Sequence, residues 1–156
     1  MRIDEKIDHG PIVAQAEVTV NEWPTYEEFE EMMAHAGAKL LADVLPKWVS
    51  GMIKEREQDH SAATTTKWIK KEDGLIDFAN EPYSDFRKIQ AFHQWPSAYF
   101  LVEHRGKMLR VKIAKASFER SSPQRGILVI ERVLPEGARE MSYADFLKGY
   151  AKTAKS

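Results

Sequence analysis

The order of the elements that the sequence predicts limits the folds open to this chain. A β-branched run at residues 12–20 predicts a strand. Thr25 and Glu28 have the spacing of a capping box, and apolar residues then recur every three or four positions as far as Trp48, which predicts a long amphipathic helix. One strand and one helix cannot cover both faces of a parallel α/β layer. We therefore expect this segment to be the end of a larger domain.

The remainder of the chain reads as a linker followed by a β-rich unit. The long helix should end near Pro46 and Gly51, and the charged, Ser- and Thr-rich residues 54–66 are typical of a linker. A short helix should begin at Pro82, and a terminal helix at Ser142. Three strands are expected, with a glycine turn between the first two, at residues 98–103, 108–116 and 126–133. The predicted fold class is α+β.

The net charge of −1 conceals two segments of opposite sign. Residues 1–63 hold six basic and thirteen acidic side chains, a formal charge of −7, whereas residues 64–156 carry +6. Such asymmetry favours a polyanionic partner for the basic segment, although opposite charges can also serve only packing and solubility. The chain has no cysteine, which excludes disulfides, thiolate ligands and a cysteine nucleophile. It has no run of about 18 apolar residues, so we expect no membrane span.

Several stretches carry a family resemblance, in the same order as in that family. They are residues 1–12 (MRIDEKIDHGPI), 67–78 (KWIKKEDGLIDF), 91–98 (AFHQWPSA), 135–141 (PEGAREM) and 145–149 (DFLKG). Together they resemble the C-terminal portion of methionyl-tRNA formyltransferase. The resemblance implies that residues 1–53 are the end of a Rossmann-like formyltransferase domain, 54–75 a linker, and 76–156 an OB-like domain. Because few residues separate Ala116 from Gly126, we expect that barrel to be incomplete.

The resemblance also implies a chemistry. The family formylates initiator methionyl-tRNA with 10-formyltetrahydrofolate in the cytoplasm, and Asp8 matches its catalytic carboxylate. The family's Asn-x-His motif and Ser-Leu-Leu-Pro loop do not occur in this sequence and would lie before Met1. We therefore expect the chain alone to be inactive as a transferase and to need no cofactor. His9 should be an exposed turn residue, and the spacing of the other histidines predicts no metal site.

The basic segment is expected to bind initiator tRNA. The resemblance implies a positive surface formed by the linker and the C-terminal domain. Phosphate contacts are expected from the side chains of Lys67, Lys70, Lys71, Arg105, Lys107, Arg110 and Lys112. Alternation places Arg110 and Lys112 on one strand face, although such lysines can also merely protect a sheet edge. Trp68 could stack on a base. We expect core positions for Trp95, Phe100, Leu109, Val111 and Ile113.

Two other functions remain open. The chain could be a non-catalytic module that binds RNA or completes the fold of another chain. The tail of a sugar-nucleotide formyltransferase is disfavoured by the Lys-Glu-Asp-Gly motif of residues 71–74. An isolated strand and helix would also expose apolar faces, which predicts a homodimer that buries Ile12, Phe29 and Leu41.

Overall fold

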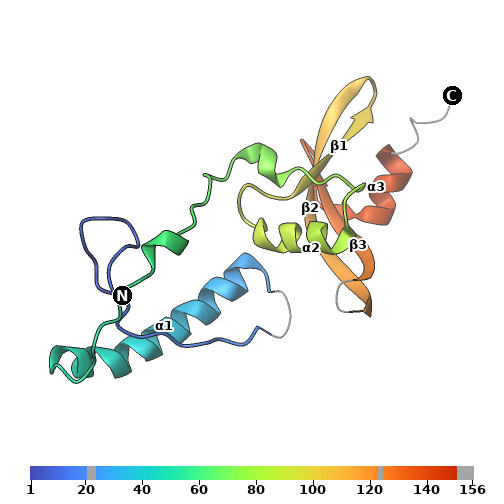
Figure 1. Cartoon of the computed structure of the whole chain (residues 1–156). Helices are drawn as coiled ribbons and strands as arrows, with labels where there is room; N and C mark the ends of the chain where they lie inside the picture. The colour runs from blue at the N-terminus through green and yellow to red at the C-terminus, as the bar shows by residue number, and fades with distance from the viewer. Residues whose placement is uncertain (21–23, 123–124, 151–156) are drawn as a thin grey trace. The chain divides into compact units, whose positions relative to one another are not determined.

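The computed structural model describes residues 1–20, 24–122 and 125–150 and divides the chain into two compact units, Met1–Lys67 and Trp68–Ser156 (Figure 1). The division falls inside the expected linker, residues 54–75. Residues 123–124 and 151–156 of the expected C-terminal domain lie outside the described residues. Among the residues described, no helix is long and apolar enough to cross a membrane. The chain combines helices with an antiparallel sheet, which confirms the α+β class at this coarse level.

The first unit is built on helix α1 (Tyr26–Val49). Its capping box forms as the sequence predicts, because the Thr25 hydroxyl accepts from the Glu28 amide and the Glu28 carboxylate accepts from the Thr25 amide. Pro46 lies in the last turn of the helix, which ends three residues later at Val49, and the chain leaves the helix through Gly51 at a φ of +75°. A short 3-10 turn, η1 (His60–Ala62), follows.

The strand expected at residues 12–20 does not form. Ile12 exchanges two backbone hydrogen bonds with Arg56, of 2.8 and 2.9 Å, and this is the single β-bridge described for residues 1–20. The Arg2 amide also donates to the Pro11 carbonyl at 3.0 Å, but residues 13–20 are not in a strand. The β-branched run has the local propensity of a strand but no neighbouring strand within the described part of its unit. A strand needs that partner for its backbone groups, so the prediction was wrong.

The second unit is a four-stranded antiparallel sheet in the order β1-β2-β3-β4 (Figure 1). The strands are β1 (Tyr99–His104), β2 (Lys107–Ser122), β3 (Arg125–Pro135) and β4 (Met141–Ser142). The first three match the predicted strands, and β2 continues six residues past its predicted end at Ala116. The fourth was missed because it is only two residues long. The hairpin turn between β1 and β2 uses Arg105 and Gly106, both at positive φ.

Two helices cover one face of this sheet. Helix α2 (Pro82–Ala91) packs on β2 and β3, and α3 (Tyr143–Tyr150) packs on β3 and β4. They bury a core that contains Ile76, Ile89, Ala98, Phe100, Val111, Ile113, Val133 and Phe146. Phe100, Val111 and Ile113 were predicted core residues, and Leu109 packs against the core while half-buried. The opposite face of the β1–β2 pair is left for the charged residues of these strands.

Trp95 is not a core residue, contrary to the sequence prediction. Its side chain is 56% exposed, while the neighbouring Pro96 and Ala98 are buried. Pro96 lies against Gly74, where an added Cβ would come within 3.3 Å of the proline ring. The chain therefore uses the proline to fill this contact, and the indole of Trp95 is left facing solvent.

Candidate nucleic-acid interface

The outward face of the β1–β2 pair presents two of the predicted cations. Val111 pairs with Phe100 and both are buried, so the residues on either side of Val111 point away from the core. These residues are Arg110, which pairs with Leu101, and Lys112, which pairs with Tyr99. The alternation in the sequence thus corresponds to a real face of the sheet, and both cations remain partly exposed.

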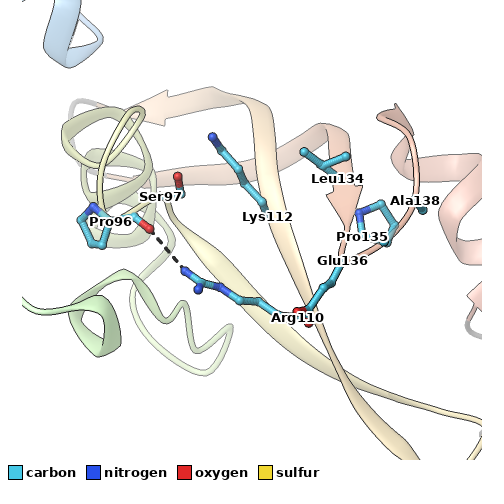
Figure 2. A pocket seen from close by; sticks show the side chains of 9 residues that line it. Pro96, Ser97, Arg110, Lys112, Leu134, Pro135, Glu136 and Ala138 are labelled. Atoms are coloured by element: carbon cyan, nitrogen blue, oxygen red, sulfur yellow. Dashed lines mark hydrogen bonds between the residues drawn. The ribbon is translucent and has the colours of Figure 1, made fainter.

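Arg110 and Lys112 line an open groove of about 390 Å³. Figure 2 shows Lys112 between the Pro96–Ser97 segment on one side and the residues that follow Leu134 on the other. The Arg110 guanidinium donates to the Pro96 carbonyl at 3.3 Å and lies 3.8 Å from the centroid of the Tyr99 ring. These two contacts hold the guanidinium in place before any ligand arrives.

The linker lysines are fixed to the same unit by a close backbone contact. Lys70 and Lys71 begin the turn η2 (Lys71–Gly74), in which the Lys70 amide donates to the Asp73 carboxylate at 2.7 Å. A Cβ on Gly74 would lie only 2.4 Å from the Ser97 carbonyl oxygen, so the two segments touch at backbone level. Both lysines therefore belong to a turn that rests on the Pro96–Ser97 wall of the groove.

The other predicted cations lie elsewhere. Arg105 is in the hairpin turn, and Lys107, five residues from Lys112, begins β2. Lys107 also has the opposite strand parity from Arg110 and Lys112. Lys67 is the last residue of the first unit. Within the second unit, the predicted cations thus do not all lie on one strand face.

The ion pairs of the second unit leave these cations available. Within the described residues, none of the seven predicted cations forms an ion pair, whereas Lys115 binds Glu131 at 2.7 Å and Arg132 binds Glu140. The Lys115 ammonium, with a hydrogen bond from Ser117, lowers the pKa of Glu131. The cations that the sequence singled out are therefore free of a carboxylate partner in the described chain, while their neighbours on the sheet are neutralised.

Asp8 lies in the first unit, in an exposed turn at a φ of +53°. The Gln58 side chain fixes this turn, because its amide donates to the Asp8 carbonyl at 2.9 Å and to the Gly10 carbonyl at 2.7 Å. No hydrogen bond or ion pair to the Asp8 carboxylate is found in the part of the chain that the structure describes. Asp8 therefore has no neighbour here with which to share a proton.

His9 is more engaged than an exposed turn residue. A 2.7 Å hydrogen bond joins its Nδ1 to Asp4, and its ring stacks on His60 with centroids 3.8 Å apart. The contact with His9 lowers the pKa of Asp4. No local sequence pattern points to the stacked pair, since His60 is 51 positions away from His9 along the chain. Among the described ranges, no group of three His, Asp or Glu residues could hold a metal ion.

Comparison with known proteins shows the family of this chain. Residues 68–126 match the family model of the formyl transferase C-terminal domain. A methionyl-tRNA formyltransferase of Chloroflexus aggregans is 40% identical over 129 residues, which are 83% of this chain and 41% of the relative. Another, of Thermodesulfovibrio yellowstonii, is 31% identical over 96% of this chain and 52% of its own length.

The resemblance to methionyl-tRNA formyltransferases is thereby confirmed, and the chain is a relative of these enzymes that is similar to their C-terminal portion. It spans about two-fifths to half the length of the relatives that it matches.

Proposed function

We propose that the second unit binds RNA, and specifically initiator tRNA, as the RNA-binding part of a methionyl-tRNA formyltransferase. The observation that carries this proposal is the pair Arg110 and Lys112. They share one solvent-facing strand face, line one groove and have no carboxylate partner in the described chain. Cations without a carboxylate partner are free to bind phosphate oxygens. When they neutralise these phosphates, the nucleic acid releases its bound counterions, which favours binding.

The turn η2 extends this surface. Lys70 and Lys71 begin a turn whose last residue, Gly74, touches the groove wall at Ser97. Two pairs of cations therefore belong to neighbouring segments of one unit and can follow one phosphate backbone. Arg105 and Lys107, at the far end of the hairpin, would add contacts only to a longer segment of the nucleic acid.

Formyl transfer itself needs more than this chain's residues supply. The methionyl amine must lose a proton and the tetrahedral intermediate must have its oxyanion stabilised. Asp8 is the proposed catalytic carboxylate, but it is exposed and, within the described residues, has no partner, and the sequence lacks an Asn-x-His motif. The residues present therefore do not fit a site for 10-formyltetrahydrofolate, and we propose that the chain alone does not transfer formyl groups.

The proposal extends to the finer fold and to location. We regard Met1–Lys67 as containing the end of a Rossmann-like formyltransferase domain, and the open sheet of the second unit as an incomplete OB-like barrel. The second assignment is supported by the sheet being antiparallel and open, as an incomplete barrel would be. A cytoplasmic location follows from the proposed role in translation initiation.

The test is a titration of the full chain with initiator tRNA at increasing salt. If the four cations near the groove each contact a phosphate, log K should fall with log salt at a slope of about −3 to −4. The double variant Lys70→Ala/Lys71→Ala should reduce that slope by about 1.5 to 2. A matched control is Lys148→Ala, which removes an exposed lysine on α3 that already pairs with Asp145. A binding constant that does not respond to salt would overturn the proposal.

One observation favours the alternative of an interaction module. Helix α1 has no buried residue, and Phe29 and Leu41 are 43% and 60% exposed. An apolar face of this kind is typical of a surface that another polypeptide covers. We propose that a second copy of the chain covers it, together with Ile12, in a homodimer.

A further inference from the structure

We propose that the groove lined by Arg110 and Lys112 binds one unpaired nucleotide, with its phosphodiester at the two cations and its base on the apolar wall. This inference rests on the proposed RNA-binding function and makes it specific. It assigns to the groove a single-stranded segment of the RNA instead of a duplex backbone. The evidence is the charge of the groove, the composition of its walls and its size.

The charge of the groove matches a phosphodiester. Its lining includes two cations, Arg110 and Lys112, and one carboxylate, Glu136, so its formal charge is +1. A phosphodiester carries one negative charge, which this lining balances. Because strand residues two positions apart have Cα atoms about 6.6 Å apart, both side chains can reach the same phosphate.

The Arg110 guanidinium already contacts two groups of the chain, and its remaining N–H groups are open to a ligand. The Tyr99 ring lies against the Arg110 guanidinium at 3.8 Å, and the Pro96 carbonyl accepts from its Nη2 at 3.3 Å. The remaining N–H groups of this planar fork are left to bind a phosphate oxygen. Lys112 has no hydrogen bond or ion pair within the described residues, so its ammonium can turn toward the same anion.

The walls of the groove are apolar, which charge alone does not explain. Pro96 forms one side, and Leu134, Pro135 and Ala138 form the other (Figure 2). Pro96 and Pro135 are buried, but Leu134 and Ala138 are partly exposed, and an inorganic anion would leave those two side chains in contact with water. A base, by contrast, has a flat apolar face that can pack on the exposed parts of Leu134 and Ala138. The volume of about 390 Å³ is within the range of pockets that hold small organic molecules, about 300 to 1,000 Å³.

An unpaired nucleotide can offer both of these features. In an RNA duplex the base faces are stacked inside the helix, and a protein reaches mainly the phosphates and the 2′-hydroxyls. In a single strand the base can turn outward and pack on a protein surface. Because the cations Arg110 and Lys112 lie beside an apolar wall, the groove should favour a single-stranded segment over a duplex.

The test is an NMR titration of the full chain that follows the amide signals of Ser97, Lys112, Gly137 and Ala138. The probes are the dinucleoside monophosphate ApA, which has one phosphodiester and two bases, dimethyl phosphate, which lacks the base, and adenosine, which lacks the phosphate. We expect saturable shifts with ApA and at least tenfold weaker binding of the other two probes. Equal affinity for ApA and dimethyl phosphate would overturn the inference.

Two variants distinguish the contribution of the cations from that of the apolar wall. Lys112→Ala should weaken ApA and dimethyl phosphate alike, by about tenfold, because each loses a charge-assisted hydrogen bond. Leu134→Ala should weaken ApA by about threefold and leave dimethyl phosphate unchanged, because only the base uses that wall. The control Lys148→Ala removes the same charge outside the groove and should change neither. An equal effect of Leu134→Ala on both probes would count against the proposed base contact.

The failure of this inference differs from the failure of the proposed function. If initiator tRNA binds with the expected salt dependence but ApA moves no groove amide, the groove does not read a nucleotide and RNA binding stands. If ApA binds at the groove but tRNA does not bind, the nucleotide site stands and the assignment of tRNA falls.

Discussion

The contact between Gly74 and Ser97 gives the sharpest prediction about the second unit. The substitution Gly74→Ala would place a Cβ 2.4 Å from the Ser97 carbonyl oxygen and 3.3 Å from the Pro96 ring. The oxygen belongs to the backbone and cannot move aside as a flexible side chain does. The turn η2 must therefore separate from the loop that precedes β1.

The energetic cost follows from the bonds next to this contact. The Ile76 amide donates to the Tyr99 carbonyl at 2.7 Å, and Lys88 donates to the Leu75 carbonyl at 2.6 Å. Loss of one or two such bonds costs about 1 kcal/mol each, and overpacking adds about 1 to 3 kcal/mol. We expect a loss of about 2 to 5 kcal/mol, which lowers the melting temperature of a unit of this size by roughly 10–40 °C.

Scanning calorimetry measures this change, with the NMR amide signals of β2 identifying the transition of the second unit. The matched control is Gly149→Ala in α3, where an added Cβ meets no atom within 4 Å and alanine is the better helix former. The control should melt at the same temperature as the unsubstituted chain or slightly higher. If Gly74→Ala melted within about 2 °C of the unsubstituted chain, the close contact would not anchor η2 and the reasoning would be refuted.

Three further predictions concern single contacts. Ser142→Ala should cost the second unit about 1 kcal/mol in urea unfolding, because the Ser142 hydroxyl accepts from the Asp145 amide at 3.1 Å at the start of α3. Asp4 has a pKa lowered by His9, so its contribution to stability is present above its ordinary pKa of 3.8 and lost as the pH falls below it. Asp4→Asn should thus destabilise the first unit more at pH 6 than at pH 2, and equal effects at both would contradict this. In light scattering, the chain should be a dimer and Leu41→Lys a monomer, since Leu41 is 60% exposed on α1. A monomeric unsubstituted chain at micromolar concentration would rule out the homodimer.

Local signals in the sequence identified the elements that local contacts determine. The capping box at Thr25 depends on residues three positions apart, and the β1–β2 hairpin depends on a glycine turn and on strict alternation. The failed strand at residues 12–20 shows the limit of such signals. Its composition is that of a strand, but strand formation is decided by a partner elsewhere in the chain, and Ile12 finds only Arg56. Propensity describes what a segment can adopt, not what lies next to it.

The same distinction applies to the candidate site. Alternation alone placed Arg110 and Lys112 on one face, because a strand's period is a local property. The walls of the groove come from segments about 14 and 24 positions away from these cations, and no local pattern links Pro96 or Leu134 to them. Nor did the sequence show that Tyr99 lies under the Arg110 guanidinium.

The charged turn of residues 71–74 and the loop at Pro96 and Ser97 contact each other, which explains why both motifs occur in this chain. The turn of residues 71–74 ends in a glycine because a backbone oxygen of the loop at Pro96 and Ser97 occupies the space of a side chain. The loop in turn accepts a hydrogen bond from Arg110 through its Pro96 carbonyl. A single backbone contact thus brings the linker lysines to the wall of the groove that holds the strand cations. Gly74→Ala should therefore weaken the proposed RNA binding as well as stability, which the salt titration with initiator tRNA measures, even though the glycine itself is not proposed to contact a phosphate.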